Sequence, residues 1–463
     1  MPFSYLVAAT YLVPHVALAI CRLLATAVLQ GVWRLTGRYP RFTMRGVTKA
    51  TLTAQLRKSG CLDASRRVAG VRWEVMEAGS VSSVHRLHLT YEDVDVGGQS
   101  APSVALRPAP PPCTTGPTTI VVKVLGGDAK CRIINSLVKI YPVEVRDYRC
   151  LRNYGRIAAL QPFVYGLEYA AWLGMGIILL EDLGHLRCRK SRDPAGATRE
   201  EAFALARVAG AVHAASYGNV ALLRQFEYRL PHFDHIFPLS VKTCKTVLIG
   251  IGLTRDRYPH IWQGLDDLCE PNFHELQLRR FRGIGLDPRD TISDVDMATR
   301  FVVNHGDLRL DNAFFVDLES DQQHRAGSTT TEARVVDWQV SFTRAPYYDL
   351  CWILDEVAQP TLDANPSFLI DFLTAYQGAF AAMVVGRECP FSLDGLLANV
   401  PWGLYTNLHY LAVAAPGMVT DVKTLPPSGF SFLRTMERLD HLLSRYVSVA
   451  FRRENGLADA HDW

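Results

Sequence analysis

Eight consecutive residues, HGDLRLDN at 305–312, combine side chains suited to phosphoryl transfer. Within them Asp307 and Asn312 are spaced D-x-x-x-x-N. In phosphoryl-transfer loops with this spacing, the carboxylate lies near the attacking hydroxyl and the amide oxygen binds magnesium. A further carboxylate, Asp337, follows an apolar run in VVDW, residues 335–338. Magnesium prefers hard oxygen ligands and usually keeps several waters, so one Asp and one Asn suffice to hold it.

Two charged residues upstream form a second candidate set. Lys123 stands inside the β-branched run TTIVVKVL, residues 118–125, and Glu144 follows on a predicted helix. The order of strand lysine and then helix glutamate is that of kinases, in which the glutamate positions the lysine on the α and β phosphates. The alternative is a solvated surface lysine, because strand alternation lets every second side chain point outward.

The elements that must position these residues follow from hydrophobic periodicity. Alternation and β-branched runs predict strands, and 3.6-residue spacing predicts helices. Loops are predicted at 78–83 and 97–117, and the polar segment 318–332 is a predicted hairpin loop. From Glu200 the pattern is mostly helical, which indicates an α+β protein with two unequal lobes. The predicted strands are 71–77, 84–91, 118–125, 177–180, 312–316 and 333–337, and helices are predicted at 48–58 and from Pro142.

Composition excludes several classes of protein. The 463 residues are 48% hydrophobic with a net charge of +3. A disordered chain is therefore excluded, and nucleic-acid binding by charge is not expected. The ten cysteines form no C-x-x-C pair, which argues against a zinc ribbon or a disulfide scaffold and suits a reducing compartment.

The N-terminal segment differs from the rest of the chain. Residues 3–33 are almost wholly apolar, with Pro14 as an expected helix breaker, and a run of basic residues follows them. Basic residues after the apolar run predict a cytoplasmic catalytic domain. Three placements stay open: a spanning helix, an interfacial helix on a membrane surface, and a helix packed on the main domain. The basic residues are Arg34, Arg38, Arg41, Arg45 and Lys49.

Taken together, these motifs resemble one family of small-molecule kinases. The sequence HGDLRLDN is similar to the H-G-D-x-x-x-x-N loop of aminoglycoside phosphotransferases, choline kinases and their ecdysteroid-kinase-like relatives. The resemblance extends over about residues 48–445. It implies a protein-kinase-like two-lobed fold that uses ATP and magnesium to phosphorylate a hydroxyl of a small molecule. Further matching segments are EVRDY (144–148), IILLEDLG (177–184), AVHA (211–214), and VDW followed by Pro346 and Asp349-Leu350.

The resemblance also implies a role for each motif residue. Asp307 is the expected catalytic base, and Asn312 and Asp337 are the expected magnesium ligands. Lys123 would bind phosphates, oriented by Glu144. The backbone of Glu181, Asp182 and Leu183 would hold adenine, and the loop that contains Gly79 and Ser80 would cover the phosphates. Asp349 is expected to brace the catalytic loop, and His305 and His213 are expected to be structural.

The expected domain order is an anchor or interfacial segment at 1–45, a kinase-like N-lobe at 46–183, and a helical C-lobe at 184–463. The loop at 78–83 has one glycine where relatives often have two or three. An alternative function is therefore a catalytically inactive, membrane-associated nucleotide-binding module. A protein kinase is the other alternative, but the H-R-D, D-F-G and A-P-E motifs are absent.

The acceptor is expected near the catalytic loop and the helices after Glu200. The aromatic stretch 402–410 is a candidate for lining it, and an ordinary core segment is the alternative reading of that stretch. Aminoglycoside, choline-like, sterol-like and sugar acceptors all stay open.

Overall fold

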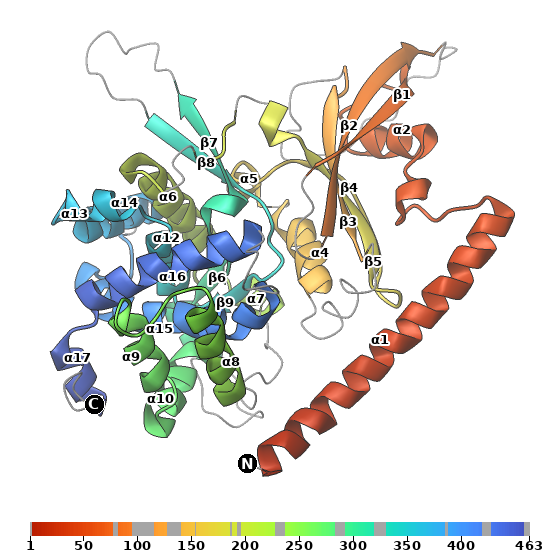
Figure 1. The fold of residues 1–463 in the computed structure, drawn as a ribbon. Coiled ribbons are helices and arrows are strands. Elements are labelled where there is room, and N and C mark those ends of the chain that lie inside the picture. Colours follow the sequence, from red (N-terminus) through yellow and green to blue (C-terminus); the bar gives the residue numbers. More distant parts are fainter. Residues whose placement is uncertain are drawn as a thin grey trace, which may run out of the picture. The chain divides into compact units, whose positions relative to one another are not determined.

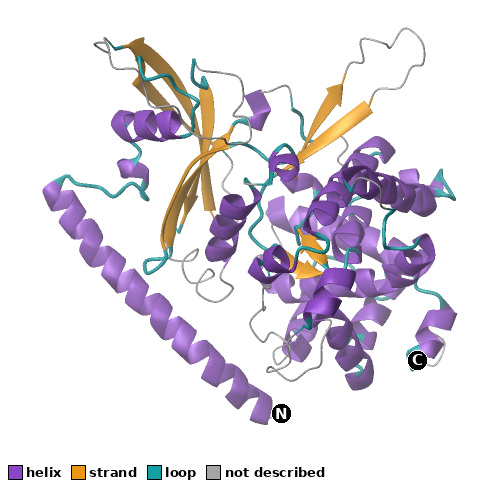
Figure 2. Cartoon of the chain, turned by 180° about the vertical axis from the view of Figure 1, so that it is seen from behind, coloured by secondary structure: helices purple, strands orange, loops and turns teal. Residues whose placement is uncertain are grey.

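The structure, a computed structural model, divides into two compact units (Figure 1). The first comprises Met1–Cys188 with Val336–Val340, and the second comprises Arg189–Val335 with Ser341–Trp463. Both contain strands as well as helices (Figure 2), which confirms the predicted α+β class. The described residues are 2–76, 82–94, 115–126, 140–152, 154–185, 188–191, 196–226, 237–282, 292–318, 330–384, 388–418 and 427–457.

A five-stranded antiparallel sheet forms the centre of the first unit. Its order is β1-β2-β3-β5-β4. Helix α2 (Lys49–Lys58) packs on one face, and its N-terminus is fixed by a capping box between Thr48 and Thr51. Helix α4 (Ile140–Leu151) supplies Glu144 to Lys123 of β3. The strands are β1 (Arg66–Val75), β2 (Ser82–Asp93), β3 (Thr119–Leu125), β4 (Val164–Ala170) and β5 (Met175–Glu181).

The two faces of this sheet differ because side chains alternate along each strand. On the face toward α2, a fully buried core forms from Leu52 and Leu56 of the helix and from apolar residues of β2, β3 and β5. Lys123 lies between Val122 and Val124 of that core and therefore points to the opposite face. The sheet thus carries its lysine on the side away from α2.

Helix α1 (Pro2–Thr36) is continuous through Pro14, so the expected break is wrong. The helical residues on both sides of Pro14 continue the helix past the one backbone hydrogen bond that proline cannot donate. Ala25, Leu29 and Trp33 pack against a small cluster around Leu173, which lies between β4 and β5. None of the described helices combines the length and apolarity needed to cross a membrane.

The second unit is mainly helical. Two small antiparallel pairs accompany the helices: β6 (Val302–Asn304) with β9 (Phe342–Arg344), and β7 (Ala313–Leu318) with β8 (Thr330–Val335). The catalytic-loop sequence lies between β6 and β7. The helices include α6 (Arg199–Ser216), α10 (Pro271–Arg282), α11 (Asp294–Arg300), α12 (Tyr347–Asp355), α14 (Phe368–Met383), α15 (Leu393–Met418), α16 (Pro427–Tyr446) and α17 (Val449–Glu454).

Several predicted elements are confirmed, and others need correction. The helix at 48–58, the strands at 84–91, 118–125, 177–180 and 312–316, and the hairpin of β7 with β8 are present. Helix α4 begins at Ile140, two residues before the predicted start at Pro142. Ser82 and Ser83 belong to β2 and not to the predicted loop. Most of that loop, with Gly79 and Ser80, lies outside the described residues, as does most of 97–117 and of the hairpin loop.

The remaining differences concern strands. Strand β8 ends at Val335, so Asp337 lies two residues beyond the strand that was predicted to include it. Strand β1 begins at Arg66, five residues before its predicted start. The prediction also missed β4, whose burial alternates poorly, and the three-residue strands β6 and β9. A strand of three residues is too short for its hydrophobic alternation to be recognised in the sequence.

Candidate active site

Lys123 of β3 lies between two carboxylates in the first unit. Its Nζ donates to Glu144 Oε1 at 2.7 Å and also to Asp337 Oδ1. The Lys123 side chain is 8% exposed, Glu144 is fully buried, and Asp337 is 26% exposed. The predicted lysine–glutamate pair is therefore present, and Lys123 is not a solvated surface residue. Of these three side chains, Asp337 is the most accessible.

The charges of this cluster depend on one another. Burial acts to lower the pKa of Lys123, but the carboxylates of Asp337 and Glu144 outweigh it and raise that pKa, so the ammonium stays charged. Burial raises the pKa of Glu144 to about 7, although Lys123 opposes the rise. A charged ammonium beside the partly exposed carboxylate of Asp337 is suited to phosphate binding.

Asp337 has an unusual backbone. Its φ is 70°, the one positive value found among the described non-glycine residues. Its N–H donates to the hydroxyl of Tyr148 at 3.3 Å, and Tyr148 is one turn beyond Glu144 on α4. A left-handed conformation costs a non-glycine residue about 1–2 kcal/mol. Such strain persists where the surroundings fix it and is concentrated at functional sites.

Lys123→Ala is expected to weaken nucleotide binding more than it weakens the fold. The substitution removes the cation that would face the phosphates, while the apolar core on the other face of the sheet is untouched. Lys123→Arg is not expected to rescue binding, because a planar fork does not replace a compact ammonium between two carboxylates. Calorimetric titration with a non-hydrolysable ATP analogue measures the affinity, and thermal melting is the control. Unchanged affinity in both variants would contradict a phosphate-binding role.

Asp307 and Asn312 meet in the second unit. The Asn312 side-chain amide donates to the Asp307 carbonyl at 2.8 Å and to Asp307 Oδ2 at 2.9 Å. Both amide hydrogens are used, so the amide oxygen is the group left for a metal. Arg309 Nε lies 2.8 Å from Asp307 Oδ1, and the Asp307 side chain is 21% exposed. The predicted base is therefore fixed in orientation but accessible.

Arg309 is a residue that the motif comparison did not single out. It lies between the two motif positions and pairs with Asp307 and, at 3.7 Å, with Asp311. Position alone could have suggested it, since a residue two places after a carboxylate in a tight loop lies within reach of it. The D-x-x-x-x-N pattern does not specify which amino acid occupies that position.

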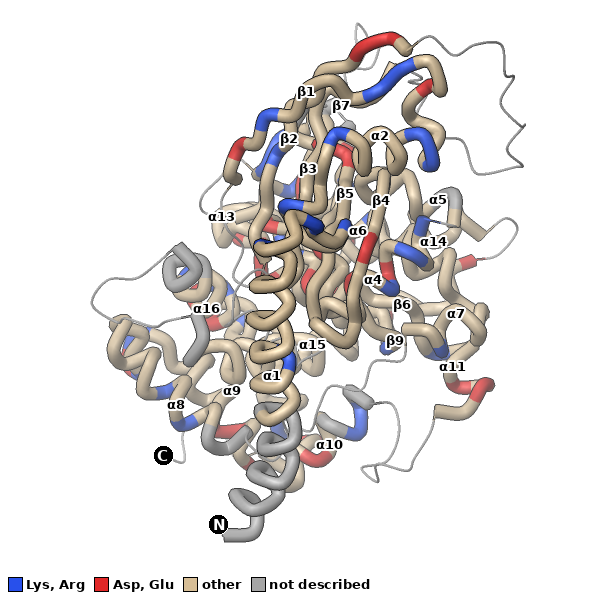
Figure 3. Tube along the Cα trace, turned by 90° about the vertical axis from the view of Figure 1, so that its right-hand side faces the viewer, with Lys and Arg blue, Asp and Glu red and all other residues tan. Residues whose placement is uncertain are grey.

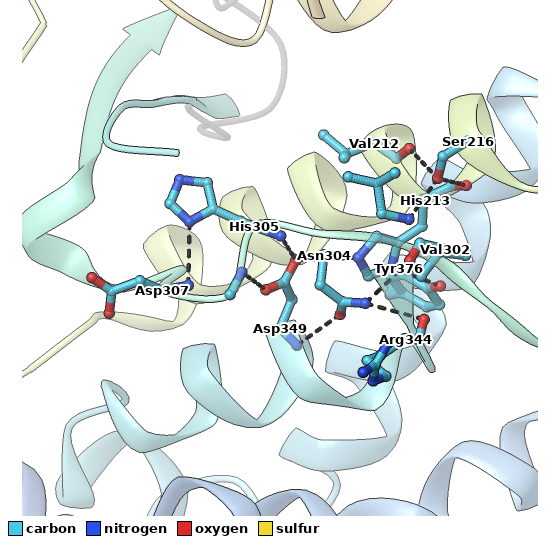
Figure 4. Close-up of polar contacts among 12 residues, drawn as sticks. Val212, His213, Ser216, Val302, Asn304, His305, Asp307, Arg344, Asp349 and Tyr376 are labelled. Atoms are coloured by element: carbon cyan, nitrogen blue, oxygen red, sulfur yellow. Dashed lines mark hydrogen bonds and ion pairs between the residues drawn. The ribbon is translucent and has the colours of Figure 1, made fainter. Parts of the chain in front are cut away.

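The loop before Asp307 is held by a buried network (Figure 4). Asp349 of α12 accepts the backbone N–H of His305 at 2.7 Å and that of Gly306 at 2.9 Å. Its own N–H donates to Asn304 Oδ1 at 3.3 Å. Gly306 has a φ of 80°, which a side chain would strain. These contacts confirm that Asp349 braces the catalytic loop.

His213 of α6 completes the network. Its two ring nitrogens lie 3.2 Å from Asp349 Oδ2 and 3.1 Å from the Tyr376 hydroxyl of α14. His213 is fully buried, as expected for a structural residue. His305 is also buried, and its Nδ1 accepts the Asp307 N–H at 3.4 Å. The histidines thus support the loop and leave Asp307 as the side chain placed for chemistry.

The segment expected to hold adenine follows β5. Glu181 ends the strand, and its N–H donates to Phe163 O at 2.8 Å, so that group is already used. Asp182 and Leu183 are buried. The Asp182 carboxylate is bound by Arg86 of β2. No motif in the sequence pointed to Arg86.

The residues suit magnesium in their chemistry. Asn312 offers an amide oxygen and Asp337 a partly exposed carboxylate, both hard ligands. Among the described residues, no group of three or more His, Cys, Asp or Glu side chains is placed to hold a metal ion. Magnesium usually keeps several waters, so its binding does not require such a group.

The aromatic stretch at 402–410 is largely core. Trp402 stacks on Phe273 of α10 with 5.4 Å between ring centroids, and Tyr405 contacts the same ring at 4.8 Å. Both are almost fully buried, and both also contact Phe451 of α17. Trp402 and Tyr405 are therefore core residues, which was the alternative interpretation of this stretch. His409 and Tyr410, at the end of the stretch, are only partly buried.

Comparison with known proteins identifies the family of this chain. A β3 lysine with its α4 glutamate, and a braced HGD loop ending in Asn312, define a small-molecule kinase of the protein-kinase-like fold. The model of the ecdysteroid kinase-like family matches residues 120–384, more than half of the chain. The chain belongs to this family, which confirms the predicted family, fold and enzyme class. The search of the curated proteins returns no match.

Solved structures of similar proteins include three small-molecule kinases. A microcompartment-associated aminopropanol kinase is 14% identical and has a TM-score of 0.41, covering 88% of this chain and 99% of its own. A choline kinase of Cryptosporidium parvum is 10% identical, with a TM-score of 0.43 and coverage of 88% and 96%. An aminoglycoside phosphotransferase of Alicyclobacillus acidocaldarius is 10% identical, with a TM-score of 0.39 and coverage of 86% and 94%.

Proposed function

We propose that this protein transfers the γ-phosphate of ATP to a hydroxyl group of a small molecule, with magnesium as cofactor. The observation that supports it most is the buried Lys123, held by Glu144 and Asp337. Burying an ammonium is costly unless it is paired, and a sheet does not need one for packing. Phosphate binding would explain why a charged lysine is kept at this buried position.

Each residue has a role in the proposed reaction. Asp307 accepts the proton of the attacking hydroxyl, and the oxygen of that hydroxyl forms a bond to the γ-phosphorus. The bond from phosphorus to the bridging oxygen breaks, and ADP leaves. Lys123 neutralises charge on the phosphates, and Asn312 and Asp337 would hold magnesium, which supplies further charge neutralisation. Positioning and electrostatics account for most of such catalysis.

Titration with a non-hydrolysable ATP analogue, with magnesium and with chelator, tests the cofactors. We expect tight binding with magnesium and much weaker binding with chelator. Equal affinity in the two conditions would contradict magnesium dependence. Binding without any transfer or hydrolysis of ATP would favour the inactive nucleotide-binding module.

A second proposal concerns the placement of the protein on a membrane surface. Helix α1 exposes Leu24, Val28, Val32 and Leu35 on one side, with exposed fractions from 46% to 89%. Positions four and three residues apart share a helix face. Figure 3 shows basic residues gathered where the chain passes from α1 to α2. An apolar face beside basic residues suits an interface rich in anionic lipid.

The triple variant L24Q/V28Q/V32Q is expected to lose binding to phosphatidylserine-containing vesicles. Each side chain contributes about 1 kcal/mol of apolar burial at an interface, so together they weaken partitioning roughly 100-fold. Cosedimentation measures the bound fraction. The control is Leu29→Gln, which changes a side chain that packs on the first unit. We expect this control to lower the melting temperature while leaving the exposed face intact. Undiminished vesicle binding by the triple variant would contradict an interfacial helix.

A further inference from the structure

Arg86 of β2 lies on the face of the sheet that carries Lys123. Arg86 is directly opposite Val121 of β3, and Val121 is opposite Leu180 of β5. Opposed residues share a face, and so do residues two apart on a strand. Arg86 therefore lies on the Lys123 face, in the neighbouring row, about 7 Å along the strand direction.

This row is partly open. Val121 and Arg86 are only half-buried, whereas Leu87 and Val122 on the opposite face are fully buried under α2. If Lys123 holds phosphates, the ribose and base of the nucleotide extend away from it along the sheet. The open row at Val121 and Arg86, beside Asp182 and Leu183, is the next surface on that face.

The Arg86 guanidinium is fixed in one plane. Its Nε donates to Asp182 Oδ2 at 2.6 Å, its Nη2 to Asp182 Oδ1 at 3.3 Å, and its Nη1 to Glu74 Oε1 at 3.3 Å. Asp182 is 3% exposed, and the Arg86 side chain is 25% exposed. A Cβ added at Gly184 would lie 3.2 Å from Nη2, so the absence of a side chain there leaves room for the guanidinium.

We propose that Arg86 is a base-binding residue of the nucleotide site, on whose guanidinium plane, held by Asp182 and Glu74, the base of the phosphate donor stacks. The inference rests on the proposed function. A guanidinium is planar, delocalised and weakly hydrated, and it stacks well on aromatic faces. Its edge is occupied by carboxylates, and the flat face is the part of the group that these hydrogen bonds do not use. Stacking detects the π-face and not the base edge, so adenine and guanine are bound alike.

Three ligands separate stacking from a merely structural role. They are the magnesium complexes of a non-hydrolysable ATP analogue, of the matching GTP analogue, and of inorganic triphosphate, which has no base. Arg86→Ala is expected to weaken both nucleotides by similar factors, about 5- to 150-fold, from the 1–3 kcal/mol of one stacked base. Triphosphate affinity is expected to change less than twofold. Arg86→Lys keeps the charge but lacks the plane, and it should not restore nucleotide affinity.

Two further variants distinguish a loss of stacking from a loss of the fold. Arg86→Ala leaves the buried Asp182 without its partner, so R86M/D182N removes both charges together. Arg67→Ala is the matched control, because Arg67 is on β1 of the same sheet, pairs with Glu92 and is 58% exposed. R86M/D182N is expected to show the same selective loss as Arg86→Ala, and Arg67→Ala no loss.

The outcomes are distinct. Unchanged nucleotide affinity in Arg86→Ala, or an equal loss for triphosphate in both Arg86→Ala and R86M/D182N, overturns the stacking role while the proposed function stands. A loss confined to one base overturns it as well, since edge recognition would then be at work. A wild type that binds neither nucleotide overturns the proposed function and this inference together.

Discussion

Asp307→Asn is expected to lower turnover by about 10² to 10⁴, the usual contribution of a general base. Asparagine retains one acceptor oxygen for the Asn312 amide, which lies 2.9 Å from Asp307 Oδ2, but it loses the ion pair of Asp307 Oδ1 with Arg309. The variant cannot take the proton of the acceptor hydroxyl. Steady-state rates measured with magnesium and ATP give the effect. Nucleotide affinity should stay within a few-fold of the wild type, because Asp307 does not contribute to nucleotide binding in this account.

The matched control for that loss is Asp296→Asn. Asp296 is an exposed carboxylate of α11 in the same unit and pairs with Arg300. The same chemical change there should leave turnover unaltered. A comparable fall in both variants would indicate a general effect of lost charge. Full turnover in Asp307→Asn would remove Asp307 as the base.

Asp337→Asn is expected to remove the magnesium-dependent part of nucleotide binding. The carboxylate is the charged metal ligand in this account, and an amide binds magnesium less strongly. Asparagine tolerates the left-handed backbone seen at φ 70°, so the substitution tests charge and not strain. Calorimetric titration with and without magnesium should give nearly equal affinities for the variant.

A second substitution at this position separates backbone strain from metal binding. Asp337→Gly removes the cost of the positive φ as well as the carboxylate. Its melting temperature should not fall below that of Asp337→Asn, while its magnesium dependence should be equally absent. Magnesium dependence that survives in both variants would contradict the ligand role of Asp337.

The D-x-x-x-x-N spacing correctly indicated that Asp307 and Asn312 lie together. Asp307 and Asn312 are five residues apart, so their spacing alone determines that one short loop brings them together. Lys123 was identified because a charged residue in a β-branched run is conspicuous. Its partner Glu144 could be named only through the resemblance to kinases, because nothing in the intervening sequence determines how α4 packs against the sheet.

Tertiary geometry explains what could not be predicted. The left-handed backbone of Asp337 occurs together with a hydrogen bond to Tyr148, which is 189 positions earlier in the chain. Arg86 lies next to Asp182 only because of the register of β2 with β3 and of β3 with β5. A slip of one residue would turn Arg86 to the other face. Strand β4 and the pair β6–β9 are likewise recognised by their pairing with other strands, because their sequences show no clear hydrophobic periodicity.

The most direct test of the central claim is a screen of small-molecule hydroxyl compounds with magnesium and ATP, in which mass spectrometry detects the gain of one phosphate. The panel includes aminoglycoside, choline-like, sterol-like and sugar acceptors. We expect at least one phosphorylated product with the wild type and a rate about 10² to 10⁴ lower with Asp307→Asn. A wild type that binds magnesium-ATP tightly yet phosphorylates no acceptor and hydrolyses no ATP would contradict phosphotransferase activity and favour a nucleotide-binding module.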